Sequence, residues 1–296
     1  MSQPRFRHRL EYRLVIGMRA LLKVLPYGAA AALGSMIGQV AYVLAPARRR
    51  LAVDQLQAAF PTRTAPECRA IARATFRHFG RLLVAVLKFS TLTKDQMRAR
   101  VEFEGEDRLR LALAAGKGAI VVTGHFGYWE IQGVAQPLVL PAMSVMARQL
   151  DNPQLHELVE GIRCATGNRV IYRHGALRRA LRALNANEIV GILIDQHILG
   201  TDAVQVMFFN RPVATTAAVA ALALRTGAPI VPIFCLPVDA GRFRLVYEHP
   251  VEFPAGGSAD PILELTQRCT DVLEMYVRRH PQLWLWMHRR WREATD

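Results

Sequence analysis

The feature that most constrains the fold of this chain is a regular alternation of short apolar runs and amphipathic segments, beginning at about residue 101. The runs VEFEG, GAIVVTG, MSVMAR, RVIY and EIVGILID have the length and β-branched content of strands, and helical patterns lie between them. PIVPIFCLPV and RFRLVYE close the series, before a long helix predicted over residues 260–281. Alternating strands and helices form layered α/β structures. We therefore predict an α/β fold with a largely parallel central sheet flanked by helices.

Residues 1–50 lack this alternation and contain a long uncharged segment. No charged residue occurs between Lys23 and Arg48, and the segment 25–45 is about long enough to cross a bilayer. A buried core helix would show the same pattern, but we favour a hydrophobic helix inserted in, or lying on, a membrane, with the arginines at 48–50 near the headgroups. The long polar lead argues against a secretory signal. We predict a membrane-associating helical region over residues 1–50 and a single α/β domain over residues 51–296.

The charge balance indicates an anionic partner. The chain has 38 Lys+Arg against 24 Asp+Glu, a formal net charge of +14, which suits nucleic acid, a membrane surface, a phosphorylated lipid or an acidic protein. Four cysteines are scattered without a C-x-x-C pair, which argues against a zinc site and a disulfide framework and favours a reducing environment.

Polar residues follow two of the predicted strands. Gly124-His125 comes after AIVVT, and Asp195-Gln196-His197 comes after EIVGILI. Ligands of open α/β sheets bind beyond the carboxyl ends of the strands, so we expect both segments to face one crevice. We treat His197 as a bystander, and Asp195 either positions a substrate or caps the strand–loop junction.

His125 is the candidate general base. Glu130 lies five residues later, at the start of a predicted helix, where its carboxylate could accept a hydrogen bond from one ring nitrogen and leave the other basic. No G-x-S-x-G, P-loop or H-E-x-x-H motif is present. A base without a protein nucleophile suggests that the nucleophile is a substrate hydroxyl.

The motif GHFGYWE resembles the H-x-x-x-x-E signature of the bacterial lipid A secondary acyltransferases, the lauroyl and myristoyl transferase family. Further blocks resembling this family cover nearly the whole chain: RRRLAVDQLQAAFP, ARQLDNPQLHELVEGIRCATG, the segment from GILIDQH to GAPIVPIF, and WLWMHRRW. Glutamate in the motif favours this branch over the glycerolipid acyltransferases, whose motif ends in aspartate. Tyr128 departs from the asparagine often found there, which puts any role of that amide in doubt.

The resemblance implies a glycerolipid-acyltransferase-like fold and a reaction that moves a fatty acyl group from acyl carrier protein (ACP) to a hydroxyl of a membrane glycolipid, such as a lipid A precursor. His125 and Glu130 would be the catalytic dyad, and Arg148, Arg163 and Asp195 would bind substrate. Backbone N–H groups at the start of the helix and Arg148 could stabilise the oxyanion, and both arginines suit acceptor phosphates. We expect no metal or cofactor besides the acyl-ACP or acyl-CoA co-substrate, and a location on the cytoplasmic face of the bacterial inner membrane.

Two alternatives stay open. The same chemistry could serve another membrane lipid, of acyl-mannoside or lysophospholipid type, with acyl-CoA as donor. A non-enzymatic basic protein that binds a membrane or nucleic acid is the other class. Neither a helix-turn-helix nor an RNP-like aromatic motif is evident, so we expect no nucleic-acid partner.

Overall fold

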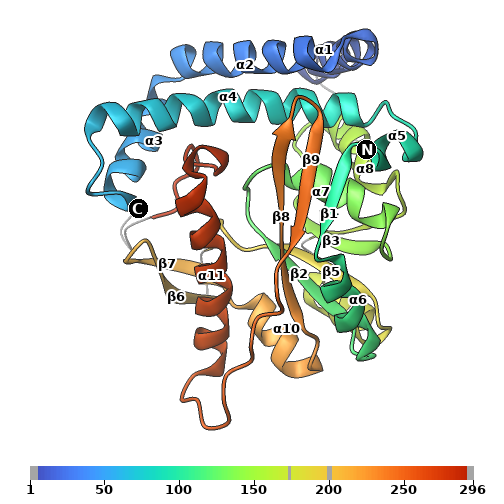
Figure 1. The fold of residues 1–296 in the computed structure, drawn as a ribbon, viewed down its shortest axis with the longest axis vertical. Coiled ribbons are helices and arrows are strands. Elements are labelled where there is room, and N and C mark those ends of the chain that lie inside the picture. Colours follow the sequence, from blue (N-terminus) through green and yellow to red (C-terminus); the bar gives the residue numbers. More distant parts are fainter. Residues whose placement is uncertain (1–5, 173–174, 199–201, 292–296) are drawn as a thin grey trace.

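The computed structural model describes residues 6–172, 175–198 and 202–291 (Figure 1). Its helices are α1 (Phe6–Val24), α2 (Tyr27–Leu44), α3 (Pro46–Ala59), α4 (Ala65–Phe89), α5 (Lys94–Arg98), α6 (Glu106–Ala114), α7 (Trp129–Ala135), α8 (Pro153–Cys164), α9 (Ala176–Asn185), α10 (Ala218–Thr226) and α11 (Pro261–Arg279). Its strands are β1 (Val101–Glu104), β2 (Ala119–Thr123), β3 (Met143–Ala147), β4 (Arg169–Tyr172), β5 (Ile189–Leu193), β6 (Ala203–Phe208), β7 (Arg211–Thr216), β8 (Ile230–Asp239) and β9 (Arg242–Tyr247).

Seven of these strands form one sheet in the order β1-β9-β8-β2-β5-β3-β4. The pairings from β8 through β2, β5 and β3 to β4 are all parallel, β9 runs antiparallel to β8, and β1 is parallel to β9. The predicted α/β class with a largely parallel central sheet is therefore confirmed.

Alternate residues of the central strand β2 supply two separate cores. Ile120 and Val122 pack in the core that includes residues of α9, α10 and α11, whereas Ala119 and Val121 pack in the core that includes residues of α6 and α7. All five residues of β2 are buried, as expected for a strand covered by helices on both faces.

Two predicted helices differ from the observed ones. The helical pattern between the runs GAIVVTG and MSVMAR forms a helix only to Ala135 and continues as a 3₁₀ turn (Gln136–Leu138), because Pro137 has no N–H group to donate. The helical pattern before PIVPIFCLPV forms a helix only from Ala218, since Thr215 and Thr216 belong to β7. The β6–β7 hairpin was not predicted, and it turns through Phe209 and Asn210, both with positive φ.

The helices α1 and α2 form an outer layer on α4, at one end of the molecule (Figure 1). Of the described helices, α2 is long and apolar enough to cross a membrane by length and composition. The helix α3 continues through the boundary predicted at residue 50, and that boundary stays a prediction. All four cysteines are free thiols, as the absence of paired spacing suggested.

Candidate active site

The site lies where two neighbouring parallel strands end. Thr123 and Leu193, the last residues of β2 and β5, are register partners, so the chain leaves both strands at the same edge of the sheet. This register brings His125 and Asp195 together although 70 residues separate them. The expectation that the two strand ends face one crevice is confirmed.

Asp195 holds the imidazole of His125. The ring Nδ1 lies 2.8 Å from Oδ1 of Asp195, and the backbone N–H of His125 donates to Oδ2 at 2.7 Å. Because a carboxylate only accepts, Nδ1 carries the proton and Nε2 is the basic nitrogen. The side-chain amide of Gln196 lies 3.2 Å from Nε2, in position to donate to it.

Asp195 is buried behind His125, and its predicted role in substrate binding stays a prediction. It is 3% exposed, and Oδ2 also accepts a hydrogen bond of 2.8 Å from Nε1 of Trp284. With both oxygens occupied by His125 and Trp284, the carboxylate faces the imidazole and the C-terminal segment rather than the crevice. Asp195 therefore orients the imidazole of His125, a role that was not predicted for it.

Glu130 differs from its predicted placement, because Nδ1 of His125 bonds Asp195 and Nε2 lies beside Gln196. Its carboxylate forms a two-pronged pair with Arg163, at 2.9 Å from Nε to Oε2 and 2.5 Å from the terminal nitrogen to Oε1. Both side chains are about one-fifth exposed. Glu130 remains close enough to raise the pKa of His125 by its charge, so it acts on the imidazole from a distance.

The pKa of His125 reflects opposing effects. Burial lowers it, but the Asp195 carboxylate and, more weakly, Glu130 outweigh burial, and the net pKa is above the ordinary histidine value. Burial likewise raises the pKa of Asp195, yet its hydrogen bonds from His125 and Trp284 prevail and hold that pKa below its usual range. The geometry therefore provides an ionised carboxylate beside a base of strengthened proton affinity.

The loop that carries His125 is fixed by contacts with Cys235 and with His78 of α4. Gly127 has φ of +58°, and a Cβ there would lie 2.1 Å from the carbonyl oxygen of Cys235. His78 of α4 donates from Nε2 to the carbonyl of Gly127 at 3.0 Å, and burial lowers the pKa of His78 to about 4, so it stays neutral. Tyr128, the residue that departs from the family pattern, packs against the His78 ring.

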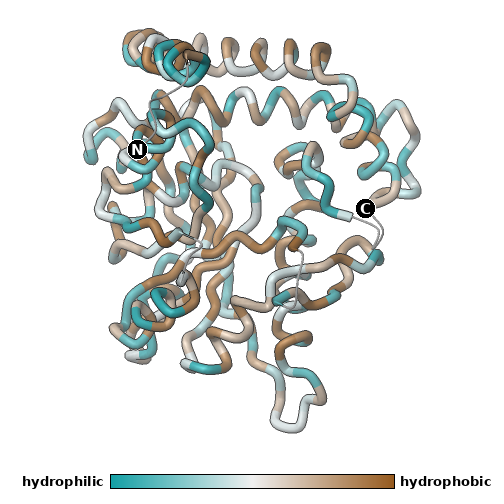
Figure 2. Tube along the Cα trace, turned by 180° about the vertical axis from the view of Figure 1, so that it is seen from behind, coloured by the Kyte–Doolittle hydropathy of each residue, from teal (hydrophilic) through white to brown (hydrophobic). Residues whose placement is uncertain are grey.

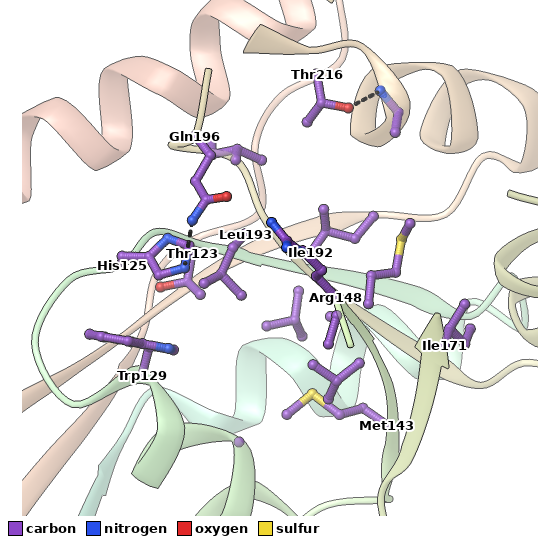
Figure 3. Close-up of a pocket in the computed structure, with 18 of the residues that line it drawn as sticks. Thr123, His125, Trp129, Met143, Arg148, Ile171, Ile192, Leu193, Gln196 and Thr216 are labelled. Atoms are coloured by element: carbon purple, nitrogen blue, oxygen red, sulfur yellow. Dashed lines mark hydrogen bonds between the residues drawn. The ribbon is translucent and has the colours of Figure 1, made fainter. Parts of the chain in front are cut away.

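A pocket of about 700 Å³ opens in front of His125. Figure 3 shows His125 and Trp129 at one side and Met143 and Ile171 at the other. Its polar residues include His125, Glu130, Arg163 and Gln196, and its apolar residues come largely from β2, β3 and β5. Arg148 also lines this pocket, but its side chain is 84% exposed and pairs with Asp151 at 3.2 Å.

Three residues that support this site were not predicted as site residues, although Gln196 was expected at the crevice. Trp284 bonds Asp195, Gln196 contacts His125, and the buried guanidinium of Arg290 donates to the carbonyls of Gln196 at 3.1 Å and Ala214 at 2.7 Å. Burial lowers the pKa of Arg290 to about 10, which leaves it charged at neutral pH. The WLWMHRRW block was a signal, since buried tryptophan and arginine need partners. His197, treated as a bystander, lines the pocket.

Among the described residues, no three His, Cys, Asp or Glu side chains gather in positions that could hold a metal ion. That the reaction requires no metal or cofactor stays a prediction.

An Asp–His pair whose basic nitrogen faces a pocket with largely apolar walls is suited to removing a proton from a substrate hydroxyl. The sequence pattern described as the bacterial lipid A biosynthesis acyltransferase family matches residues 2–293. The chain belongs to this family and is a transferase of acyl groups.

Individual relatives agree with the family match. The lipid A biosynthesis palmitoleoyltransferase of Escherichia coli strain K12 is 26% identical over 280 residues, covering 94% of this chain and 89% of the relative. The lauroyltransferase of the same organism is 25% identical, over 96% and 92% of the two chains. A phosphatidylinositol mannoside acyltransferase of Mycobacterium tuberculosis strain H37Rv is 25% identical, over 74% and 69%.

Proposed function

We propose that this enzyme transfers a fatty acyl group from an acyl thioester, preferably acyl-ACP, to a hydroxyl of a membrane glycolipid such as a lipid A precursor. The observation that carries the proposal is the orientation of His125. Its Nδ1 is bonded to buried Asp195, and its basic Nε2 is directed to a pocket of about 700 Å³ with apolar walls. The names of the relatives, lipid A and phosphatidylinositol mannoside acyltransferases, support a glycolipid acceptor.

In this mechanism Nε2 of His125 takes the proton of the acceptor hydroxyl while its oxygen attacks the thioester carbonyl carbon. Asp195 stabilises the imidazolium that forms, and the tetrahedral intermediate then collapses with cleavage of the carbon–sulfur bond. The leaving thiolate takes the proton back from His125, which restores the neutral base. General-base catalysis of this kind contributes about 10²–10⁴-fold in rate.

Arg163 is the positively charged group of this pocket that is held most firmly. Its two-pronged bond to Glu130 fixes the guanidinium plane, and the carboxylate outweighs the effect of burial, so the pKa of Arg163 is raised. We assign it to the oxyanion or to an acceptor phosphate, either of which suits a guanidinium. Arg148, exposed on the pocket rim, is the candidate for contact with acceptor phosphates further out.

The net charge supports acyl-ACP as the donor. Acyl carrier proteins are acidic, so a chain of net charge +14 should meet them by electrostatic steering, which weakens as salt rises. We place the enzyme at the cytoplasmic face of the bacterial inner membrane, where acyl-ACP and a membrane-bound acceptor can meet.

A second candidate keeps the chemistry and changes both substrates. The similarity to phosphatidylinositol mannoside acyltransferases favours an acyl-mannoside or related lipid acceptor, with acyl-CoA as donor. CoA thioesters that react as fast as acyl-ACP at every salt concentration and chain length would favour this candidate.

The proposal is tested by mass spectrometry of membrane lipids from cells with and without the gene. We expect one lipid species to lose one acyl group, and plasmid-borne wild type to restore it. The variant His125→Ala, at matched protein level, should not restore it and should lower transfer from acyl-ACP in vitro by at least about 100-fold, as expected on loss of a general base. Wild-type turnover by His125→Ala would overturn the mechanism.

A further inference from the structure

Four arginines form a row along α4. Arg69, Arg73, Arg77 and Arg81 recur every fourth residue, so they share one face of the helix, and all four are exposed. In the described part of the chain, none of them forms an ion pair with a carboxylate, and Arg73 donates to the amide oxygen of Gln39 on α2 at 2.6 Å. Like charges one turn apart repel each other, so this arginine row is arranged for an anionic partner.

The arginine row borders α2 because the two helices touch backbone to backbone. A Cβ on Gly34 would lie 2.7 Å from Cα of Arg81, and one on Gly38 would lie 2.7 Å from Cα of Arg77. On the other helix, a Cβ on Gly80 would lie 2.1 Å from the carbonyl oxygen of Gly34. Any larger residue at these positions would push the helices apart, so α2 is fixed along α4.

The side of α2 turned away from α4 is apolar. Only 17% of α2 is buried, and its exposed residues are all apolar. The exposed apolar residues of α1 recur at spacings of three, four and seven, and the exposed side chains of Arg9 and Arg13 lie beside them. We call this surface the apolar stripe; it comprises Phe6, Leu10, Leu14, Leu21 and Val24 on α1 and Ala29, Ala32, Met36, Val40 and Val43 on α2. Figure 2 shows hydrophobic residues recurring along these helices at the edge of the molecule.

The first helix is fastened to α4 as well. The ammonium group of buried Lys88 donates to the carbonyls of Leu22 at 2.7 Å and Leu25 at 2.6 Å, which satisfies the C-terminal end of α1. Arg19 donates to the side chain and the carbonyl of Ser90 at 3.0 and 3.1 Å. Neither helix is therefore a free anchor attached by a linker.

These contacts decide between a helix that crosses a bilayer and one that lies on it. An 18-residue helix is about 27 Å long, close to the thickness of the hydrocarbon layer. If α2 stood upright in that layer, Arg77 and Arg81 would be carried into the hydrocarbon beside Gly38 and Gly34, which is strongly unfavourable for charged side chains. If α2 lies parallel to the surface, the same arginines reach lipid phosphates while the apolar stripe enters the acyl boundary.

We propose that α1, α2 and the arginine row form a docking face for an anionic lipid surface, on which α2 lies parallel to the membrane and does not cross it. The loop that carries His125 packs on the same helix α4. His78 donates to the carbonyl of Gly127, and the rings of Phe79 and Trp129 lie 5.7 Å apart between centroids. Asn152, near the pocket rim, donates to the carbonyl of His8 on α1 at 3.0 Å. If the proposed function holds, this face brings the pocket to its lipid acceptor.

The charge contribution is tested by binding of the full-length protein to phosphatidylcholine vesicles with and without phosphatidylglycerol. The test variant carries Arg69→Gln, Arg77→Gln and Arg81→Gln. The matched control removes three exposed arginines of α9 and α10, of which α10 lies at the end of the molecule opposite α2 (Figure 1): Arg178→Gln, Arg182→Gln and Arg225→Gln.

We expect the test variant to partition about 100-fold less onto the anionic vesicles, because each basic residue near such a surface contributes roughly fivefold. The control should remain within about threefold of wild type, since its charges lie away from the surface. Equal losses in both variants would overturn the proposal. So would unchanged vesicle binding combined with a raised KM for acyl-ACP, which would make the arginine row a protein-binding surface.

The orientation of α2 is tested by depth-dependent quenching with brominated lipids. A fluorophore is attached in turn at Ala29→Cys, Met36→Cys and Val43→Cys, with Cys164→Ser removing the partly exposed thiol. We expect similar, shallow depths at all three positions. A deep label at position 36 between two shallow ones would show that α2 crosses the bilayer, and three unquenched labels would show that the stripe does not insert. Vesicle binding and quenching depth are both read without acyl transfer, so a negative result in either leaves the proposed function untouched.

Discussion

At the scale of single residues, the site is governed by which carboxylate touches His125. Glu130 is near in sequence, but its carboxylate is engaged by the two-pronged bond to Arg163 on α8. Asp195 is distant in sequence, but the register of β2 with β5 brings it to 2.8 Å from the ring. A direct hydrogen bond to an ionised group acts more strongly on a pKa than a charge further away. Asp195 therefore sets the tautomer and strengthens the base.

The variant Asp195→Asn distinguishes the effect of Asp195 on the pKa of His125 from that of Glu130. Removing the charge should lower the pKa of His125, so the acidic limb of the pH profile of kcat/KM should move to lower pH. The rate at its optimum should fall about 10²–10⁴-fold, because the imidazolium loses its partner. The sign follows from the base being active when deprotonated: wild type, with a raised pKa, loses activity first as the pH falls.

Glu130→Gln is the matched comparison, since it removes the same charge without touching Nδ1. The acidic limb of its pH profile should shift less than that of Asp195→Asn. Its loss of activity should come more from weaker substrate contacts of Arg163. A larger shift in Glu130→Gln would mean that Glu130 is the direct partner of His125 during catalysis.

At the scale of elements, β5 shapes the apolar part of the pocket. Gly191 is paired with Val121 of β2 and Val145 of β3, and all three residues line the cavity. A Cβ at Gly191 would lie 3.1 Å from the sulfur of Met143, so this glycine leaves room that a larger residue would occupy. An acyl chain in this pocket would gain about 0.8 kcal/mol for each methylene buried, until the available depth is used.

Gly191→Val should shorten the preferred acyl chain by about two carbons, because its methyl groups and a displaced Met143 would fill the space of two methylenes, worth about 1.6 kcal/mol. The measurement is competition among acyl-ACPs of increasing chain length, with the product read by mass spectrometry. Gly161→Ala on the exposed face of α8, where an added Cβ meets no atom within 4 Å, is the control and should leave the preference unchanged. A lower rate with the same preferred length would show that the acyl chain does not reach Gly191.

At the scale of the whole molecule, the C-terminal segment packs behind the site, against Asp195. Trp284 forms a β-bridge with Phe126, in the loop that carries His125, and its indole N–H donates to Asp195. The backbone N–H of Arg290 donates to the side chain of Gln55 on α3, which ties this segment to the N-terminal half. The Asp195 carboxylate is thus bonded by a C-terminal residue whose own segment is tied to α3.

Trp284→Phe keeps the aromatic packing and removes the hydrogen bond to Asp195. A bond to a charged group contributes about 1.5–3 kcal/mol, so we expect kcat to fall by at least about tenfold with little change in the KM of the donor. Trp286→Phe removes a similar buried bond, from Nε1 to the carbonyl of Pro281 at 2.6 Å, and should cost stability without this loss of kcat. Equal kcat in Trp284→Phe and wild type would show that the tryptophan only packs.

Much of the fold could be predicted because each signal is local. Strand-like runs predicted β1 to β5, β8 and β9, and the helical pattern at 260–281 predicted α11, since periodicity reflects which side of an element is buried. His125 was identifiable for the same reason, as a polar residue directly after a buried strand. The β6–β7 hairpin was missed because it is held in place by the packing of β6 against α11, a contact that no local pattern reveals.

Only the tertiary structure decided which side chains bond to His125, Glu130 and Asp195. Spacing along the chain suggested that Glu130 would bond His125, but a glutamate takes the partner that best satisfies its charge, and Arg163 is reached only when α8 packs beside α7. The bonds of Asp195 to His125 and Trp284 join segments 70 and 89 residues apart. The sequence alone determined which residues end the strands and where charge is absent. Which of them meet depends on strand register and helix packing, because hydrogen bonds act over about 3 Å and the chain sets such distances only when it is folded.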